Sequence, residues 1–485
     1  MAGAVQTTPG FDLQPSSHQT PLASNYITDF SFLSQYLPDT YEKEFERYGN
    51  RTISSFIRMV GAEMPSNSDL IKWAEQGRLH TKYVNCGTVA VVAGGEAIFQ
   101  VNDVLNPAGS TAQPGSGAVV QVAIRVGQTV VVVNNDGSGE FKAIVTLVNV
   151  ANSQVTLAFY DAAGYTGGSG VGNADASIFI YGSEFRKGTN GMQGSLEADD
   201  FIFENSPIII KDKYAVSGSD MAQIGWISVE SENGATGYLW YLKSEHETRL
   251  RFDDYLETAM IEAVPAEAGS GVLAQTTSTQ VGNKGSEGVF YVVQNRGNVW
   301  SGGNPNALAD FDSIVSRLDK QGSIEENVIF LNRDFGFDID DMLAAQNSYG
   351  AGGTSYGLFE NDEEMALNLG FTGFRRGYDF YKSDWKYLND PTMRGGVDGT
   401  GSINGLLVPA GSTTVYDQIL GKNAKRPFLH VRYRASETED RRYKTWITGS
   451  AGGAKTSDLD AMEVNFLSER AVCTLGANNF FIFQD

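Results

Sequence analysis

The N-terminal part of the chain shows one segment without a period, followed by two helical patterns. Residues 1–40 are rich in Gln, Ser, Thr and Pro, then add aromatic residues, and we expect an extended arm there. The stretch 41–62 predicts a helix, because larger side chains recur at spacings of three and four: Phe45, Tyr48, Thr52, Phe56 and Val60. A short second helix is expected over residues 68–78, SDLIKWAEQGR, with Ser68 as its N-cap and Gly77 near its end.

The pattern changes to a period of two between residues 85 and 182. Apolar side chains share a face at alternate positions in two segments: Val120, Val122, Ile124 and Val126, then Val155, Leu157 and Phe159. Asn135-Asp136-Gly137 is a strong hairpin signal between such runs. Short glycine-rich strands of this kind predict a small β-barrel or sandwich, inserted into a larger chain.

A long hairpin and a long helix are expected next. The segment SIFIYGSEFR would form one arm of the hairpin and DDFIFENSPIIIKDKYAVSGS the other. From about residue 234 to 264 the pattern predicts an amphipathic helix that Pro265 ends. Its apolar face is expected at Leu239, Leu242, His246, Leu250, Leu256, Met260 and Ala263.

The remaining sequence alternates between helical and strand patterns. Between 285 and 390 we expect a strand GVFYVVQ, a helix LADFDSIVSRLDKQG closed by Gly322, a strand NVIFL and a helix IDDMLAAQN. The last 60 residues predict long strands: RPFLHVRYRAS, RRYKTWITGS, MEVNFLSERAVCTL and NNFFIFQ. Mixed elements of this kind predict an α+β fold.

Composition narrows the class of protein. A chain of 485 residues that is 41% hydrophobic and 19% charged is globular and long enough for two to four domains. No window approaches the roughly 18 apolar residues of a membrane helix, and the start lacks a signal-peptide pattern, so we expect a soluble protein that does not use the usual secretion route. Cys86 and Cys473 are the only cysteines, which predicts free thiols and no zinc site built from cysteine alone.

The formal charge of −22 argues against a protein that coats itself in phosphate contacts, because such proteins cluster Lys and Arg. An acidic surface does not exclude DNA as a neighbour, since a wall that lets DNA slide past it would also be acidic or neutral. Most acidic surfaces serve solubility.

The stretch EFRKGTNGMQGSLEADD, Glu184 to Asp200, is the main candidate site. Its glycines are spaced G-x-x-G-x-x-G, which fits neither a Walker loop nor a dinucleotide fingerprint, and the acidic residues that follow would repel a phosphate. A glycine-rich tip with opposite charges on its two arms instead favours docking on a neighbouring subunit. The candidate contacts are Arg186, Lys187, Gly188, Gly191, Gly194, Glu197, Asp199 and Asp200.

Three other features offer no site for catalysis, a cofactor or a metal. Asp334-Phe335-Gly336 matches the magnesium-binding tripeptide of protein kinases, but its companion motifs are missing, so we expect a strand end and a capped helix. The nearby carboxylates lack the alternation of a calcium loop, and helix N-capping by Asp338 or Asp340 is the simpler interpretation. The four histidines show no metal or nucleophile spacing: His18, His80, His246 and His430.

The order of these parts resembles the major capsid protein of tailed bacteriophages, which has the Hong-Kong-ninety-seven-type fold. The phrases YGSEFRKGTNG and KDKYAVSGSDMAQ are similar to the hairpin segment in capsid proteins of crAss-like gut phages, and RAVCTLGANNFFIF matches the expected C-terminal strands. The resemblance spans nearly the whole chain. It implies a non-enzymatic virion protein that forms hexamers and pentamers of an icosahedral shell around double-stranded DNA, assembled in the host bacterial cytoplasm.

The resemblance also implies how the chain is divided. An N-terminal arm and helices would occupy 1–84, the inserted β-rich domain 85–182, and the extended hairpin loop 183–225. The spine helix and peripheral domain would occupy 226–284, a mainly axial domain 285–430, and C-terminal strands of the peripheral domain 431–485. The expected partners are other copies of the chain, portal, head fibre or auxiliary capsid proteins, and packaged DNA as a non-specific neighbour.

Two departures from the minimal fold affect this interpretation. The block 85–182 is an addition whose role would be decoration of the shell or bracing between capsomers, and no charged helical scaffold segment precedes the fold. The alternative is a β-rich virion decoration or receptor-binding protein, against which the long helix and the α+β unit count. An enzyme would need a polar cluster that the sequence does not offer.

Overall fold

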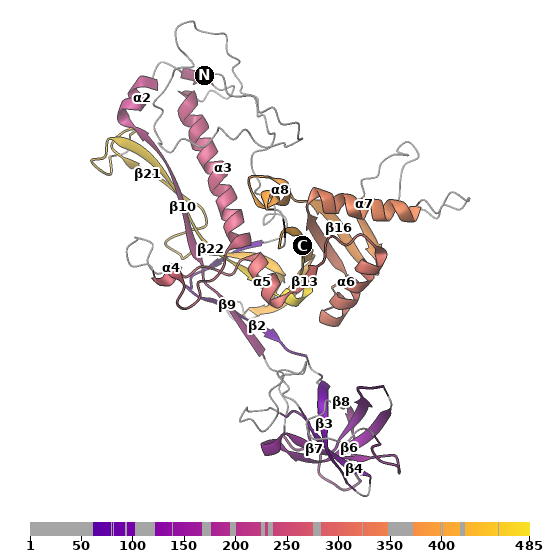
Figure 1. Cartoon of the computed structure of the whole chain (residues 1–485). Helices are drawn as coiled ribbons and strands as arrows, with labels where there is room; N and C mark the ends of the chain where they lie inside the picture. The colour runs from indigo at the N-terminus through magenta and orange to yellow at the C-terminus, as the bar shows by residue number, and fades with distance from the viewer. Residues whose placement is uncertain are drawn as a thin grey trace. The chain divides into compact units, whose positions relative to one another are not determined.

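A computed structural model describes residues 62–78, 80, 82–92, 95–101, 122–137, 139–166, 176–194, 200–224, 228–230, 236–274, 283–322, 324–347, 372–397, 399, 401–417, 422–453 and 455–485 (Figure 1). Two compact units divide the chain: Ala74–Ile202, and Met1–Trp73 together with Phe203–Asp485. The expected arm at 1–40 and residues 41–61 of the expected helix lie outside the described residues, and its last residue, Ala62, begins a strand. No described helix is long and apolar enough to cross a membrane.

The unit 74–202 contains a closed six-stranded barrel with the strand order β3-β4-β7-β6-β5-β8. All of its pairings are antiparallel. The strands are β3 (Lys82–Val92), β4 (Glu96–Gln100), β5 (Gln128–Asn134), β6 (Glu140–Asn149), β7 (Gln154–Phe159) and β8 (Ala176–Ser183), with a short 3-10 helix η2 (Val150–Asn152). The predicted barrel is therefore present, and closure leaves it without a free sheet edge.

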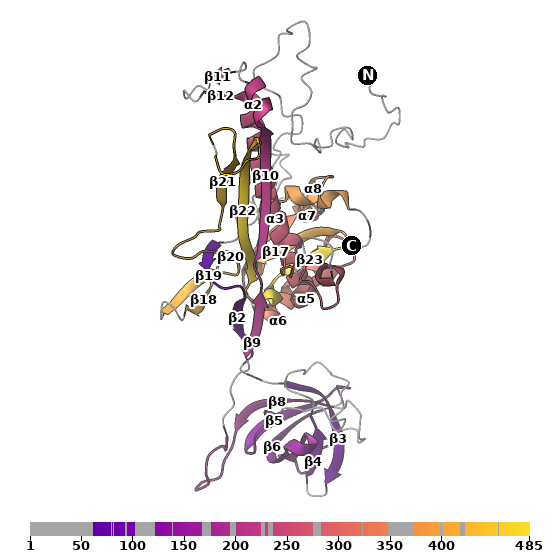
Figure 2. The same ribbon diagram turned by 90° about the vertical axis from the view of Figure 1, so that its left-hand side faces the viewer.

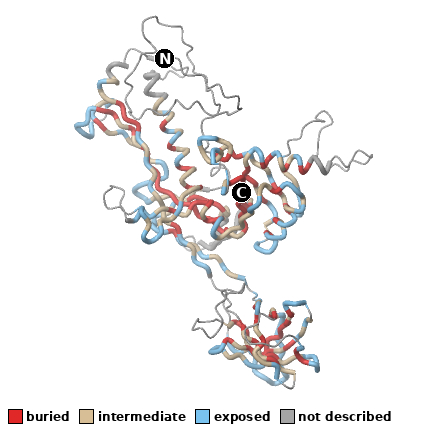
Figure 3. Tube along the Cα trace, viewed as in Figure 1, coloured by how far each residue is buried: buried red, intermediate tan, exposed pale blue. Residues whose placement is uncertain are grey.

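The barrel interior is filled by alternate side chains of these strands, as the period of two predicts. Val155 and Leu157 are fully buried, and the hairpin at Asn135-Asp136-Gly137 joins β5 to β6 with Gly137 at φ 75°. Of the other predicted strand, residues 122–125 are not in a strand, and Val126 is half exposed. Figure 3 shows the buried positions gathered inside the barrel.

A five-stranded sheet forms one half of the other unit, with the order β1-β20-β22-β10 and β21 also paired with β22. Its strands are β1 (Ala62–Ser66), β20 (Leu429–Arg434), β22 (Ala461–Thr474), β10 (Ile208–Ser217) and β21 (Lys444–Gly449). β22 runs for 14 residues and pairs with β10 along most of that length (Figure 2). Three of the four predicted C-terminal strands thus lie here.

A charged side chain of β1 contacts arginines of this sheet that lie far away in the sequence. Glu63 accepts hydrogen bonds from Arg442 and from Arg470, whose Nη1 lies 3.3 Å from Glu63 Oε1. Arg470 is 6% exposed and also donates to the carbonyl oxygen of Arg442, at 2.9 Å. A buried guanidinium needs such partners, so these side-chain contacts join β1 to the sheet in addition to its backbone pairing with β20.

The predicted long helix is α3 (Leu239–Glu262), whose 24 residues extend about 36 Å. Its buried stripe packs on β10 and β22 and differs in part from the predicted face, because His246 is exposed and Leu250 only half-buried. Spacings of four from Thr248 define the stripe instead, since these positions face the sheet: Thr248, Phe252, Leu256, Glu257, Met260 and Ile261.

A six-stranded sheet completes this unit, in the order β13-β23-β17-β14-β16-β15. The strands are β13 (Asn298–Ser301), β23 (Phe481–Gln484), β17 (Ile403–Pro409), β14 (Glu326–Leu331), β16 (Tyr378–Asp384) and β15 (Gly373–Arg376). On one face Ile329 and Leu407 pack against α6 (Leu308–Gln321) and α7 (Arg333–Asn347). On the other, Phe330 and Leu406 pack with α5 (Val289–Arg296) and α8 (Lys386–Asn389). Both faces are covered, which explains the continuous apolar runs of its strands.

Two predicted elements have the wrong type. GVFYVVQ is helix α5 and not a strand; a short apolar run is ambiguous by pattern alone, and here Gly288 and Gly297 bound one buried helix. SDLIKWAEQGR contains strand β2 (Ile71–Gln76) and not a helix, because its side chains alternate in burial and it pairs with β9 (Asp200–Asn205). Ser68 forms a local turn with Leu70 instead of an N-cap.

Smaller elements complete the described chain. The last strand, β23, was expected beside the other C-terminal strands but pairs with β13 and β17 in the six-stranded sheet. The remaining elements are α2 (Gly218–Ile224), β11 (Ser228–Glu230), β12 (Thr236–Tyr238), α4 (Gly271–Ala274), η4 (Arg394–Gly396), β18 (Ser412–Asp417), β19 (Lys422–Pro427) and η5 (Ala477–Asn479).

Candidate functional site

The candidate loop leaves the barrel at the end of β8, where its first residues are fixed to the barrel. The backbone N–H of Glu184 donates to the carbonyl oxygen of Gly127 at 3.0 Å. The Phe185 ring lies against Gly127 so closely that a Cβ atom there would be 2.5 Å from Phe185 Cε1. The Tyr160 hydroxyl donates to the Glu184 carboxylate. The close approach of the Phe185 ring and the φ of 87° favour glycine at 127.

The tip of the loop is a tight turn with two basic residues. Thr189 donates to the carbonyl oxygen of Arg186 through its backbone N–H at 3.3 Å and its Oγ1 at 2.7 Å. Gly188 has φ 81°, a conformation that a residue with a side chain rarely adopts. The carbonyl oxygen of Gly194 then accepts a hydrogen bond from Arg125 Nη1 at 2.8 Å, so both ends of the described loop are held by the barrel.

The structure places five of the eight predicted residues on this loop. Arg186, Lys187, Gly188, Gly191 and Gly194 are all exposed. Within the described residues neither Arg186 nor Lys187 forms an ion pair, in contrast to most arginines of the other unit. Glu197 and Asp199 lie outside the described residues, and Asp200 is the first residue of β9.

The expected long hairpin is wrong in its pairing. β8 pairs with β3 and β5 inside the barrel, whereas β9 pairs with β2 and β10 with β22. The two predicted arms therefore do not pair with each other over the described strands. The apolar alternation of β8 fits the barrel interior equally well, and a single strand pattern does not identify its partner.

Electrostatics at the loop root follows from the Tyr160 contact. The hydrogen bond to the Glu184 carboxylate raises the pKa of Tyr160 to about 12, with further contributions from burial and from Tyr181. The hydroxyl therefore stays protonated and continues to donate at all ordinary pH values. This is a positioning contact, since a phenol with so high a pKa is a poor proton donor in a reaction.

The kinase-like tripeptide begins a helix, as predicted. β14 ends at Leu331 and α7 starts at Arg333. The capping residue is Asn332, whose Oδ1 accepts from the N–H of Phe335 at 2.8 Å, and not Asp338 or Asp340 as predicted. Those two carboxylates bind neighbouring side chains instead: Asp338 accepts from Asn304, and Asp340 forms an ion pair with Lys382.

The histidines and cysteines occupy packing or surface positions. His80 and His246 are exposed, and His18 lies outside the described residues. Burial lowers the pKa of His430 in β20 to about 4, while it raises the pKa of the Cys86 and Cys473 thiols to about 12. Both cysteines are free and inert to nucleophilic chemistry. Across the described parts, no three His, Cys, Asp or Glu side chains are grouped to hold a metal ion.

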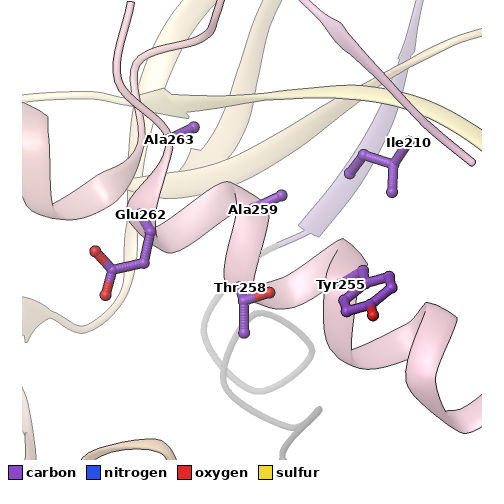
Figure 4. A pocket seen from close by; sticks show the side chains of 6 residues that line it. All are labelled: Ile210, Tyr255, Thr258, Ala259, Glu262 and Ala263. Carbon is purple, nitrogen blue, oxygen red and sulfur yellow. The ribbon is translucent and has the colours of Figure 1, made fainter. Parts of the chain in front are cut away.

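A shallow hollow lies beside α3 (Figure 4). It is lined by Ile210, Tyr255, Thr258, Ala259, Glu262 and Ala263. Its one charged group, Glu262, is already engaged by Arg394 Nε at 2.8 Å and by the Tyr387 hydroxyl at 2.6 Å. The hollow therefore offers apolar surface but no free acid or base for chemistry.

Sequence reasoning missed the residues that fix the loop root. Arg125, Tyr160 and Phe185 make these contacts, and Tyr181 lies close enough to Tyr160 to affect its pKa. One signal for Tyr181 was present: Ile178 and Ile180 alternate with Phe179 and Tyr181, which places two large aromatic residues on the outer face of the strand. The contacts of Arg125 and Tyr160 depend on barrel closure and left no local pattern.

No protein-family model and no curated protein matches the chain. Among solved structures, one from Microbacterium phage Oxtober96 is similar with 10% identity and a TM-score of 0.37, over 93% of this chain and 96% of that one. A structure from Mycobacterium phage Bobi has 8% identity and a TM-score of 0.36, over 92% and 95%. The asymmetric unit of the bacteriophage PhiM1 mature capsid has 9% identity and a TM-score of 0.31, over 62% and 78%.

Proposed function

We propose that this chain is the major capsid protein of a tailed phage of the crAss-like group, and that it assembles into hexamers and pentamers of an icosahedral shell around double-stranded DNA. The observation that carries the proposal is the packing of α3 along β10 and β22, beside a separate sheet covered by helices. A long helix on a long-stranded sheet and a compact α+β part follow one another in the order that the sequence resemblance implies.

In this proposal α3 is the spine helix and the five-stranded sheet is the peripheral domain. The six-stranded sheet with its helices is the axial domain, to which β23 adds a strand from the far end of the chain. The barrel is the inserted domain. The loop residues Arg186, Lys187, Gly188, Gly191 and Gly194 contact a neighbouring subunit, together with Glu197, Asp199 and Asp200.

Assembly would be driven by burial of surface that one subunit leaves in water. Several large apolar side chains are half exposed or more, including Ile202, Ile209, Val264 and Phe337. Many modest contacts of this kind, repeated by symmetry, stabilise a closed lattice. The charge of −22 opposes assembly through repulsion between copies, so assembly should be favoured by salt.

No reacting group is required for this function, and the proposal assigns no enzyme activity. Portal, head fibre or auxiliary capsid proteins would bind the assembled shell. Packaged DNA would be a neighbour of the shell without sequence-specific contacts, as the acidic composition favours.

The test is electron microscopy with light scattering of the chain expressed alone and then with its neighbouring virion genes. Closed shells, tubes or rings of five and six subunits are the expected result. A persistent monomer in both settings would contradict the proposal and favour the alternative, a β-rich decoration or receptor-binding protein.

The role of the loop has its own test. Shortening Lys187 to Leu196 to a tight turn should leave a folded monomer that forms no lattice, because the tip is exposed and contributes nothing to the barrel core. Hydrogen exchange of barrel peptides provides the control for folding. Normal shells from this variant would contradict the proposal that the loop contacts a neighbouring subunit.

A further inference from the structure

One end of the barrel carries a concentration of exposed apolar side chains, here called the barrel-end patch. Its members are between 38% and 53% exposed: Val126, Tyr160, Phe179, Tyr181 and Phe185. Five neighbouring aromatic or apolar side chains in water are costly unless something covers them. Aromatic residues, Tyr above all, are the side chains most enriched at the centres of protein interfaces.

The strand register shows which outward-facing residues lie next to Phe179. Val131 of β5 pairs with Lys142 of β6 on one side and with Phe179 of β8 on the other. Val131 points outward, since Val130 and Val132 are in the barrel core, yet it is only 5% exposed. The surrounding side chains therefore cover it, and Lys142 and Phe179 belong to one surface.

Tyr160 bridges this row to the loop root. Its backbone N–H donates to the carbonyl oxygen of Lys142 at 3.1 Å, and its hydroxyl donates to Glu184 beyond the end of β8. Phe185 is fixed against Gly127, next to Val126. The rings of Tyr160 and Phe185 are thus held in place before any partner arrives, which lowers the entropic cost of binding.

The edge of the patch is positively charged. Lys142, Arg186 and Lys187 are exposed, and none of them forms an ion pair with a described residue. Residues 74–202 contain 6 Lys and Arg against 11 Asp and Glu, which leaves 30 and 47 in the remaining chain. An acidic surface is therefore what a neighbouring copy of this chain offers, and the free cations complement it.

We propose that the barrel-end patch is a docking surface for an acidic segment of a second copy of this chain. Apolar side chains of that segment cover the rings of Tyr181 and Phe185, while its carboxylates pair with Arg186 and Lys187. This inference rests on the proposed function, because a lattice supplies the second copy at high local concentration, and it names the partner surface that the loop would contact.

Nucleic acid is a less suitable occupant. The Glu184 carboxylate accepts a hydrogen bond from Tyr160 and lies among the aromatic residues. It would therefore repel a phosphate backbone. The carboxylates of a protein segment can instead pair with Arg186 and Lys187 at the edge of the patch without approaching Glu184.

The experiment places a photoreactive benzophenone amino acid at Tyr181 in the full chain, mixed from normal and nitrogen-15-labelled copies. Mass spectrometry then separates cross-links between copies from those within one copy. The matched control carries the probe at Asp136, which is exposed on the same barrel in the turn at the opposite end of β5, nine residues from Gly127. Cross-links between copies to Asp- or Glu-rich peptides are expected from position 181 and not from 136.

A charge variant sharpens the result. The double substitution R186E/K187E should lower the yield from position 181 about fivefold. The control K284E/K455E reverses two exposed cations that form no ion pair with described residues, and should leave the yield unchanged.

The outcomes distinguish this inference from the proposed function. Shells that form with no cross-link between copies from position 181 overturn the docking surface and leave the capsid assignment in place. A chain that neither assembles nor cross-links contradicts both. Cross-links to DNA, or equal yields from positions 181 and 136, also overturn the inference.

Discussion

The barrel and the five-stranded sheet differ in their edge strands, because the first is a closed sheet and the second is an open one. The barrel closes on itself and fills its interior with apolar and aromatic side chains, among them Phe99, Phe159 and Tyr165. The five-stranded sheet stays open and holds β1 with the buried ion pair of Glu63 and Arg470. The first region needs only contacts formed within about 100 consecutive residues; the second needs residues from both ends of the described chain. The barrel should therefore be the more independent folding unit.

The largest expected effect is the destabilisation of the barrel by a substitution in its core. Phe99→Ala removes a fully buried ring and should lower the free energy of unfolding of the barrel by about 4 kcal/mol. Hydrogen exchange in increasing urea, measured on peptides of both units, should show the loss in residues 82–183 and not in the five-stranded sheet. Equal loss in both would mean that the two regions unfold together.

A smaller effect is expected when the five-stranded sheet loses its ion pair. Glu63→Ala leaves the buried Arg470 guanidinium without its nearest carboxylate and should destabilise the five-stranded sheet by about 3 kcal/mol. The same exchange measurement should show faster exchange in β1, β20 and β22. Glu437→Ala, at an exposed position, is the matched control. Unchanged exchange in β1 would show that backbone pairing alone holds this strand.

The pH dependence should sharpen the comparison further. Burial lowers the pKa of His430 from 6.5 to about 4, so the folded sheet binds this proton more weakly than the unfolded chain does. The stability that neutral His430 contributes is therefore present above about pH 6.5 and is lost as the pH falls toward about 4. Between about pH 7 and pH 5 the loss should be about 2 kcal/mol.

The measurement for His430 is urea denaturation at several pH values, followed by hydrogen exchange. His430→Gln should flatten the slope in the five-stranded sheet, while barrel peptides change little, since the barrel's histidine, His80, is exposed. An unchanged slope in the variant would assign the acid sensitivity to other groups.

The sequence predicted elements with strong periodicity and missed what depends on tertiary pairing. The barrel, α3, α6 and the C-terminal strands followed from periods of two and of about 3.6. Helix α5 was missed because a buried run of apolar residues has no polar face to reveal its period. Strand β2 was missed because its alternation is weak without its partner β9.

The same limit applied to the candidate site. Glycine spacing and charge identified the tip residues Arg186 and Lys187, because turn chemistry is local. The neighbours of the tip were not predictable, since Arg125 reaches Gly194 across 69 positions of sequence and Tyr160 reaches Glu184 across 24. The hairpin was predicted wrongly for the same reason, because the pattern of one strand does not identify the strand with which it pairs.

The position of β23 has a consequence for synthesis of the chain on the ribosome. Residues 481–484 lie between β13 and β17, so the six-stranded sheet remains split into two parts until this strand has emerged from the ribosome. The barrel strands, at 82–183, emerge much earlier and can close while translation continues. Each nascent chain would therefore carry a finished barrel while its six-stranded sheet is still incomplete.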